Sequence, residues 1–314
     1  MKIEPIDEIV PLKIDSPQVE ENLHRLALLL EDVRNFGTVV IRAVFIDDKG
    51  INEYVRSVVT CFLRQIVEDV DAISILINKS ASDPCFLNLR RLFENYIYLK
   101  YVLKERSEER AKAYYVNHLL SKRRHAEEGD YSTSIGKEHK AKIEKDDIAK
   151  FLELESQDCR SEVEKIDSIL QKPEYQSIKT ASDQRKKELK RARIHWYSLI
   201  DGPTSLDGLS NSVGCSGLYE VLYRYFSKFS HSENELENID SEGAGQAGLV
   251  QIRNPEHAQL ITQMALTYAF YSFQITVRTL RPQCRRCLYQ FYKENIDSPL
   301  TELKEKEVIS VIRK

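Results

Sequence analysis

The chain has 314 residues, of which 30% are charged, and its net charge at pH 7 is −3. This balance excludes the strong overall positive field that draws many proteins to nucleic acids, although it leaves room for a local basic patch. Only 11 glycines and 9 prolines are present, well below the roughly 7% and 5% of an average protein, and this scarcity favours long helices.

Membrane, export and metal-binding signals are not found in the sequence. No apolar stretch approaches the roughly 20 residues that a membrane span needs. The first ten residues contain acids where a secretory signal needs a basic start and an apolar core. We therefore expect a cytoplasmic protein with reduced cysteines. Cys284 and Cys287 form one isolated CxxC, which favours two ordinary helix cysteines over a metal or redox site, and we expect no cofactor.

Apolar spacing and capping residues predict four helices in the first part of the chain. They are expected over about Ser16–Phe45, with a bend at Gly37, over Asn52–Asn78, from Asp83-Pro84 to Lys104, and onward from Ser107. Asp83 is a good N-cap, and proline suits the first helical position because its missing N–H would be unpaired there. Glu108 and Glu109 suit the positive end of the fourth helix.

From about 137 to 193 the chain becomes highly charged and its apolar residues become sparse. This composition predicts a charged helical insertion of one or two exposed helices, broken near Pro173. The predicted organisation is therefore N-terminal bundle helices over 1–136, the insertion over 137–193, C-terminal helices of the same bundle over 194–296, and a tail over 297–314. The basic run from Arg185 to Arg193 is interpreted as a solvated helix face, with a nucleic-acid patch as the alternative.

The C-terminal part alternates between loops and helices. Loops are expected over 201–217 and 233–253, where glycine and serine are frequent. Helices are expected over 218–232, over about 254–280 and over 283–294, with an edge strand at 307–312. The fold class that follows is an all-α multi-helix bundle.

The predicted helix over 218–232 has one apolar and one polar face. At 100° per residue the apolar face contains Leu218, Val221, Leu222, Tyr225, Phe226 and Phe229, and the opposite face contains Glu220, Arg224, Ser227 and His231. Arg224 and His231 are two turns apart, about 10.5 Å along the axis. Two long side chains at this distance could contact one phosphodiester, although a solvated outer face is an equally good interpretation.

These residue types match metal-free RNA cleavage, in which a ribose 2′-hydroxyl attacks the adjacent phosphorus. Histidine suits the proton transfers because its pKa lies near neutrality. Arginine suits the phosphate because its planar fork is always charged. One helix supplies a single histidine, so a homodimer with this helix at its two-fold axis would supply both the base and the acid.

The predicted helix over 84–104 has a charged pair within its apolar stripe. Arg90 and Glu94 fall among Phe86, Phe93, Ile97 and Tyr101. Buried charges are costly unless they are paired, and residues four apart on a helix can pair. The pair indicates either a polar network that fixes the bundle or the wall of a functional site.

Together these residues resemble a family of bacterial all-helical domains of unknown function that has been likened to the HEPN (higher eukaryotes and prokaryotes nucleotide-binding) domains. The resemblance rests on Arg90-x3-Glu94, Trp196-Tyr197, Leu218-Tyr219 and Tyr223-Arg224-x2-Ser227-x3-His231, and it spans roughly 50–280. HEPN ribonucleases have an arginine followed after four to six residues by histidine, which Arg224 and His231 match at the upper limit. The first intervening residue there is often Asn, Asp or His, whereas this chain has Tyr225.

The resemblance implies a metal-independent endoribonuclease linked to toxins and phage defence, with RNA as its partner and a second protein encoded nearby. Arg224 and His231 would be catalytic, and Ser227, Arg90 and Glu94 would support them. The alternative is a non-catalytic helical binding module, such as an antitoxin, a sensor or a scaffold subunit. His118 and His125, which lie beside a basic run, are interpreted as a solvated face, with an RNA-contact surface as the alternative.

Overall fold

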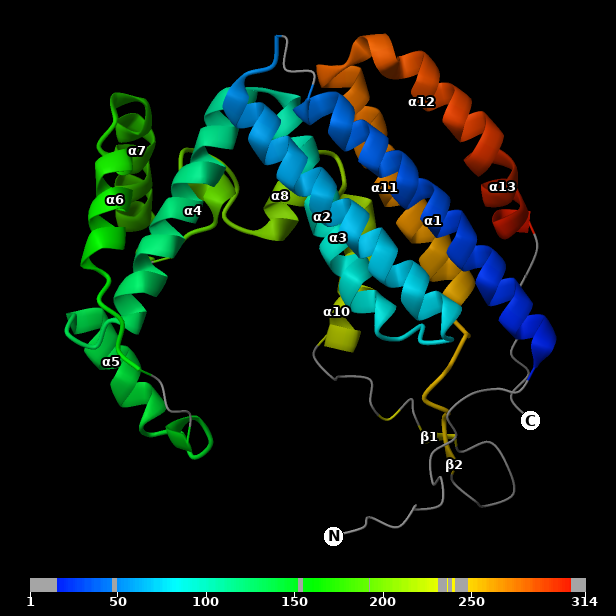
Figure 1. Cartoon of the computed structure of the whole chain (residues 1–314), viewed down its shortest axis with the longest axis horizontal. Coiled ribbons are helices and arrows are strands. Elements are labelled where there is room, and N and C mark those ends of the chain that lie inside the picture. The colour runs from blue at the N-terminus through cyan, green and yellow to red at the C-terminus, as the bar shows by residue number, and fades with distance from the viewer. Residues whose placement is uncertain are drawn as a thin grey trace. The chain divides into compact units, whose positions relative to one another are not determined.

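The computed structural model describes residues 16–46, 50–151, 155–191, 193–230, 236, 239–240 and 248–305. The helices are α1 Pro17–Phe45, α2 Glu53–Asn78, α3 Cys85–Lys104, α4 Ser107–Gly129, α5 Ser134–Ile143, α6 Arg160–Leu170, α7 Pro173–Leu189, α8 Leu206–Ser212, α9 Ser216–Leu218, α10 Arg224–Ser230, α11 Ala258–Leu280, α12 Arg285–Phe291 and α13 Asp297–Glu305 (Figure 1). The two short strands β1 Ile239–Asp240 and β2 Gly248–Leu249 pair antiparallel. The predicted all-α helical bundle is confirmed. The strand predicted at 307–312 lies outside the described residues.

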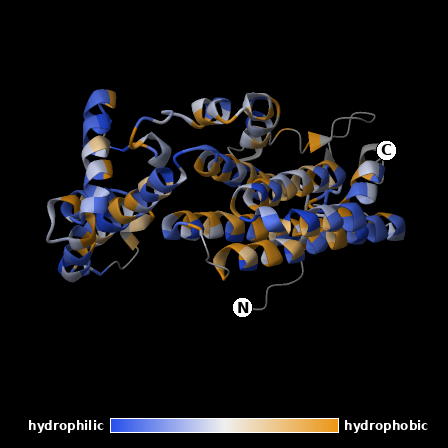
Figure 2. Cartoon of the chain, turned by 90° about the horizontal axis from the view of Figure 1, so that it is seen from above, coloured by the Kyte–Doolittle hydropathy of each residue, from blue (hydrophilic) through white to orange (hydrophobic). Residues whose placement is uncertain are grey.

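The chain divides into two compact units. The first contains residues 1–105 and 210–314, and the second contains residues 106–209. The charged insertion expected over 137–193 falls within the second unit, together with α4. Hydrophobic and hydrophilic residues both occur along the helices of each unit (Figure 2). None of the helices in the described part of the chain combines the length and the apolar character that a membrane span requires.

In the first unit α1, α2, α3 and α11 form the bundle, and α3 packs against α2, α10 and α11. Ser16 caps α1 by accepting a hydrogen bond from the Val19 N–H, and Asn52 caps α2 by accepting from the N–H groups of Tyr54 and Val55. The largest fully buried side chains include Tyr268 on α11 and Phe86 and Phe93 on α3. These contacts place α3 in the centre of the unit.

Gly37 permits close packing in the middle of α1, which is one continuous helix from Pro17 to Phe45. A Cβ atom at Gly37 would lie 2.5 Å from Cγ2 of Val67 and 2.7 Å from Cζ of Phe273. The structural reason for this glycine is therefore the close approach of α2 and α11.

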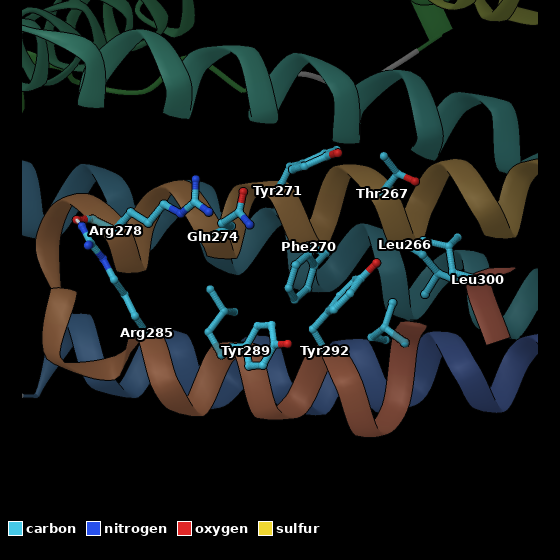
Figure 3. A pocket seen from close by; sticks show the side chains of 12 residues that line it. Leu266, Thr267, Phe270, Tyr271, Gln274, Arg278, Arg285, Tyr289, Tyr292 and Leu300 are labelled. Atoms are coloured by element: carbon cyan, nitrogen blue, oxygen red, sulfur yellow. Dashed lines mark hydrogen bonds between the residues drawn. The ribbon is translucent and has the colours of Figure 1, made fainter. Parts of the chain in front are cut away.

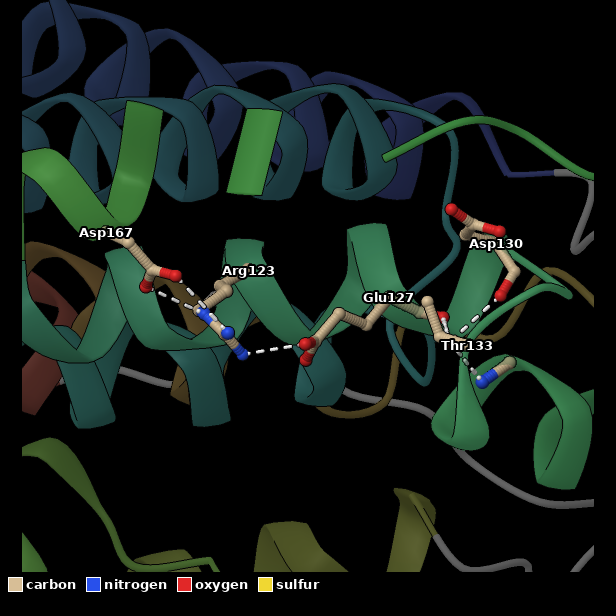
Figure 4. Close-up of polar contacts among 6 residues, drawn as sticks. Arg123, Glu127, Asp130, Thr133 and Asp167 are labelled. Atoms are coloured by element: carbon tan, nitrogen blue, oxygen red, sulfur yellow. Dashed lines mark hydrogen bonds and ion pairs between the residues drawn. The ribbon is translucent and has the colours of Figure 1, made fainter. Parts of the chain in front are cut away.

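The second unit is built around α4, which packs against α5, α6 and α7. Arg123 on α4 donates hydrogen bonds to Asp167 on α6 (2.9 Å) and to Glu127 (2.8 Å) (Figure 4). At the end of α4, hydrogen bonds from Ser132 and from the Cys159 N–H hold the pKa of Asp130 well below its usual range. The break expected near Pro173 is confirmed, because α6 ends at Leu170 and α7 begins at Pro173.

Candidate functional site

Arg90 and Glu94 lie on α3, with about a quarter of each side chain exposed. Arg90 Nε is 3.3 Å from Glu94 Oε1, so the predicted pairing between them is confirmed. Since both groups are largely removed from water, each of their remaining polar atoms needs a partner from another element.

Tyr223, 133 positions beyond Arg90, supplies that partner. Its Oη atom accepts hydrogen bonds from Arg90 Nη2 at 2.7 Å and from Nε at 3.0 Å, and donates to Glu94 Oε1 at 2.8 Å. Arg90 Nη1 also donates to Ser227 Oγ at 3.4 Å. These four residues, which we call the Arg90 cluster, join α3 to the helical segment over 216–230.

The environment of the Arg90 cluster fixes its protonation. Burial, followed by the negative charge of Glu94, raises the pKa of Tyr223 above its usual value. Burial alone would lower the pKa of Arg90, but Tyr223 and Glu94 outweigh it and raise that pKa. The Arg90 Cζ atom also lies 4.8 Å from the centre of the Tyr223 ring, in cation–π contact. At neutral pH the tyrosine therefore keeps its proton and the arginine keeps its charge.

A π-helical turn over Tyr219–Tyr223 separates α9 from α10. It changes which residues face inward, because one extra residue enters the turn. Val221, which the regular periodicity placed on the apolar face, is 70% exposed, and Leu218 is 38% exposed. The predicted face was wrong at these two positions. Tyr223, which belonged to neither predicted face, is buried instead.

Arg224 is not a member of the Arg90 cluster. Its side chain is 63% exposed, and its Nη2 atom lies 3.1 Å from Oε1 of Glu220 on the same helical segment. Ser227, which was predicted on the same face as Arg224, contacts Arg90 on α3. His231 lies outside the described residues. The structure thus brings Arg90, Glu94 and Ser227 into one cluster and leaves Arg224 on the adjacent surface.

Tyr223 is the member of the Arg90 cluster that sequence reasoning did not single out. The signal available was its spacing of four residues from Ser227, which places both side chains on one side of a helix. Arg90 and Glu94 indicated a polar network or the wall of a site, but not the tyrosine that joins them.

The polar contacts of α3 continue beyond the Arg90 cluster. Lys100 Nζ is 3.3 Å from the sulfur of Cys215, which is buried, and Lys104 Nζ donates to the carbonyl of Ser212 at 2.9 Å. Arg90 near the start of α3 contacts Ser227, and Lys104 at its end contacts Ser212, so the two segments are antiparallel. The whole segment over 212–227 is therefore held along α3 by side chains of α3.

Among the described residues, no three His, Cys, Asp or Glu side chains lie close enough together to hold a metal ion. The cysteines of the CxxC are free thiols, Cys284 partly exposed and Cys287 exposed.

No curated protein and no solved structure matches the chain. The model of the family of unknown function DUF5677 matches residues 56–246, which is more than half of the chain and includes every member of the Arg90 cluster as well as Arg224 and His231. The chain belongs to this DUF5677 family.

Proposed function

We propose that the protein is a HEPN-like, metal-independent endoribonuclease of the cytoplasm that acts on RNA as a homodimer. One observation supports this proposal above the others. The Arg90 cluster fixes the helical segment over 216–230 on α3, so that Arg224 is held at an exposed surface on a rigid element. A phosphate-binding arginine has to meet both conditions, because it must be accessible to RNA and yet positioned to better than about 1 Å.

Arg224 and His231 would divide the chemistry between them. Arg224 would bind the scissile phosphate and stabilise the charge that develops on it. His231 would take the proton of the 2′-hydroxyl or supply a proton to the leaving oxygen. The Arg90 cluster would act by positioning, because its tyrosine and guanidinium groups are already committed to one another.

The homodimer is supported by the apolar surface beside Arg224. Val221 and Leu218 are exposed on the same helical segment, although exposed apolar side chains usually gain by being covered. In a two-fold dimer each subunit would present the same patch to its partner. Contact through Val221 would bring the two Arg224 side chains close to one another and would provide the second histidine.

Toxin or phage-defence activity is part of this proposal and rests on the HEPN resemblance. A toxin of this kind would be controlled by a protein encoded nearby, and that protein would cover Arg224 or Val221. Copurification with the products of neighbouring genes would identify it.

The proposal is tested by incubating the purified protein with single-stranded RNA in EDTA. We expect cleavage that leaves 2′,3′-cyclic phosphate ends. Arg224→Ala and His231→Ala should each lower the rate by about 10²- to 10⁴-fold, the usual range for such groups. Arg64→Ala is a matched control for Arg224, because Arg64 pairs with Glu68 on an exposed helix face at 2.9 Å and is 73% exposed. Cleavage that persists in His231→Ala would refute the proposal.

The exposed apolar patch also favours a second candidate, a helical binding module without catalysis. In that case Val221 and Leu218 would dock a partner, and Arg224 would provide electrostatic complementarity. Val221→Asp would then abolish partner binding, and the wild-type protein would leave RNA intact under all conditions.

A further inference from the structure

A pocket of about 540 Å³ lies in the first unit between α11 and the C-terminal helices α12 and α13 (Figure 3). Its volume is within the roughly 300–1,000 Å³ of sites for small molecules. It lies outside the 56–246 region that the family model matches, and it shares no residue with the Arg90 cluster.

Positive charge is concentrated at one end of this pocket. Arg278 near the end of α11 and Arg285 at the start of α12 lie together there (Figure 3). Arg285 Nη2 donates to the backbone carbonyl oxygen of Arg278 at 3.0 Å, which holds the Arg285 side chain at the end of α11 where Arg278 lies. No acidic residue lines the pocket, and neither arginine has a carboxylate partner in the part of the chain that the structure describes.

The opposite end is apolar. Leu266 and Leu300 line it (Figure 3). Ile296 also lines the pocket and is fully buried. Aromatic side chains form the walls in between, where the rings of Phe270 and Tyr292 lie 4.8 Å apart. The pocket therefore combines a cationic end with an apolar body, and a single ligand spanning it must be an amphipathic anion.

We propose that this pocket binds a small organic anion with a hydrocarbon chain. The carboxylate or phosphate head would accept hydrogen bonds from Arg278 and Arg285, whose guanidinium groups suit planar or tetrahedral anions. The chain would lie between α11 and α13 and remove the exposed apolar wall from water. This site is separate from the proposed ribonuclease surface and does not depend on it.

The test is isothermal titration of the full chain with decanoate, decyl phosphate, decanol, acetate and inorganic phosphate. Decanoate and decyl phosphate are kept below the concentrations at which they form micelles, and decanol is kept below its solubility limit. We expect saturable one-to-one binding of decanoate or decyl phosphate, and the better of the two identifies the head group. Decanol, acetate and inorganic phosphate should bind at least about 10-fold more weakly. Decanol lacks the anionic head, and acetate and inorganic phosphate lack the hydrocarbon chain.

Arg278→Gln/Arg285→Gln should weaken binding of the preferred anion by about 10- to 100-fold, the usual effect of losing charged hydrogen bonds. Arg286→Gln is the matched control, since Arg286 is exposed on the same helix but does not line the pocket. Circular dichroism will show that the variants are folded. Equal binding of decanol and decanoate, equal losses in the control, or no saturable binding of either anion by the wild type would each overturn the proposal.

Discussion

The Tyr223 hydroxyl donates a 2.8 Å hydrogen bond to Oε1 of Glu94, 129 positions away in the sequence, while accepting a 2.7 Å hydrogen bond from Arg90. Arg90 and Glu94 also contact each other, so the three side chains form a closed ring. Each charged group thus has a partner within its own helix and a second on the segment over 216–230. The ring fixes both the rotation and the height of that segment on α3.

Tyr223→Phe should destabilise the protein, because it removes the hydroxyl and leaves the aromatic packing in place. Hydrogen bonds to charged groups contribute about 1.5–3 kcal/mol each, and we expect a loss of free energy of unfolding in this range. Tyr289→Phe is the control, because that exposed side chain should give a change within about 0.5 kcal/mol. Urea denaturation measures both. Equal stability of the two variants would show that the ring does not hold the segment in place.

The sequence predicts the charged pair of this site but not the tyrosine that joins it to the other helical segment. The apolar stripe of α3 and the spacing of Arg90 and Glu94 are sufficient to predict a charged pair that belongs either to a polar network or to the wall of a site. The identity of the partner was not predictable, because the π-helical turn over Tyr219–Tyr223 interrupts the regular period on which the face assignment depended. Val221 was therefore placed inside and is exposed.

The second unit shows a related limit of sequence analysis. Composition marks 137–193 as highly charged, and the break at Pro173 follows from a local rule. Local patterns do not reveal that α4 packs against α6 and α7, because that choice depends on contacts such as Arg123 with Asp167. Gly37 is a similar case, because its packing role depends on Phe273 on a distant helix.

Gly37→Ala should destabilise the first unit although alanine is the better helix former. The added methyl group would lie 2.5–2.7 Å from Val67 and Phe273, and overpacking of this kind costs about 1–3 kcal/mol. Gly217→Ala is the opposite control, because no atom lies within 4 Å of the new methyl group and helix propensity should stabilise by up to about 1 kcal/mol. Thermal unfolding should show shifts of opposite sign. A stabilising effect at Gly37 would mean that α1, α2 and α11 are less closely packed than the structure indicates.

Asp69 should make stability fall as the pH rises through the weakly acidic range. It is fully buried on α2, and burial, partly offset by its ion pair with Arg91, raises the pKa of its carboxyl from 3.8 to about 6. The folded state binds this proton more tightly than the unfolded state. The stabilisation from protonated Asp69 is therefore complete below about pH 3.8 and is lost as the pH passes about 6.

Asp69→Asn removes this titration. The free energy of unfolding of wild type minus that of Asp69→Asn should decrease as the pH rises from about 3.5 to about 7, by about 1.4 kcal/mol for each pH unit that separates the folded-state pKa from the unfolded-state pKa. Arg91→Gln removes the charge that lowers the pKa of Asp69. In the Arg91→Gln background, the stability difference between the protein with Asp69 and its Asp69→Asn variant should therefore keep decreasing to higher pH. Denaturant titrations across this range provide the measurement. A difference that grows with pH would show that Arg91 outweighs burial at this site.

Glu220→Gln should strengthen RNA binding if Arg224 contacts phosphate. Glu220 Oε1 lies 3.1 Å from Arg224 Nη2, so the carboxylate competes with the RNA phosphate for the guanidinium. Exposed pairs of this kind contribute only about 0.3–0.5 kcal/mol to stability, so the variant should fold normally. Releasing the arginine should tighten binding by about 2-fold from this term alone, and the gain should shrink at high salt because the charges are exposed.

Fluorescence anisotropy with 2′-O-methyl RNA measures this binding without cleavage, because the attacking hydroxyl is blocked. Glu68→Gln on the matched Arg64–Glu68 pair should leave the affinity unchanged. Arg224→Ala should reduce the slope of log affinity against log salt by about 1, as expected for one lost phosphate contact. Glu220→Gln/Arg224→Ala should bind like Arg224→Ala, since Glu220 has no arginine left to release. If Glu68→Gln increased the RNA affinity equally, the effect would come from the net charge of the protein. A specific contact between RNA and Arg224 would then be contradicted.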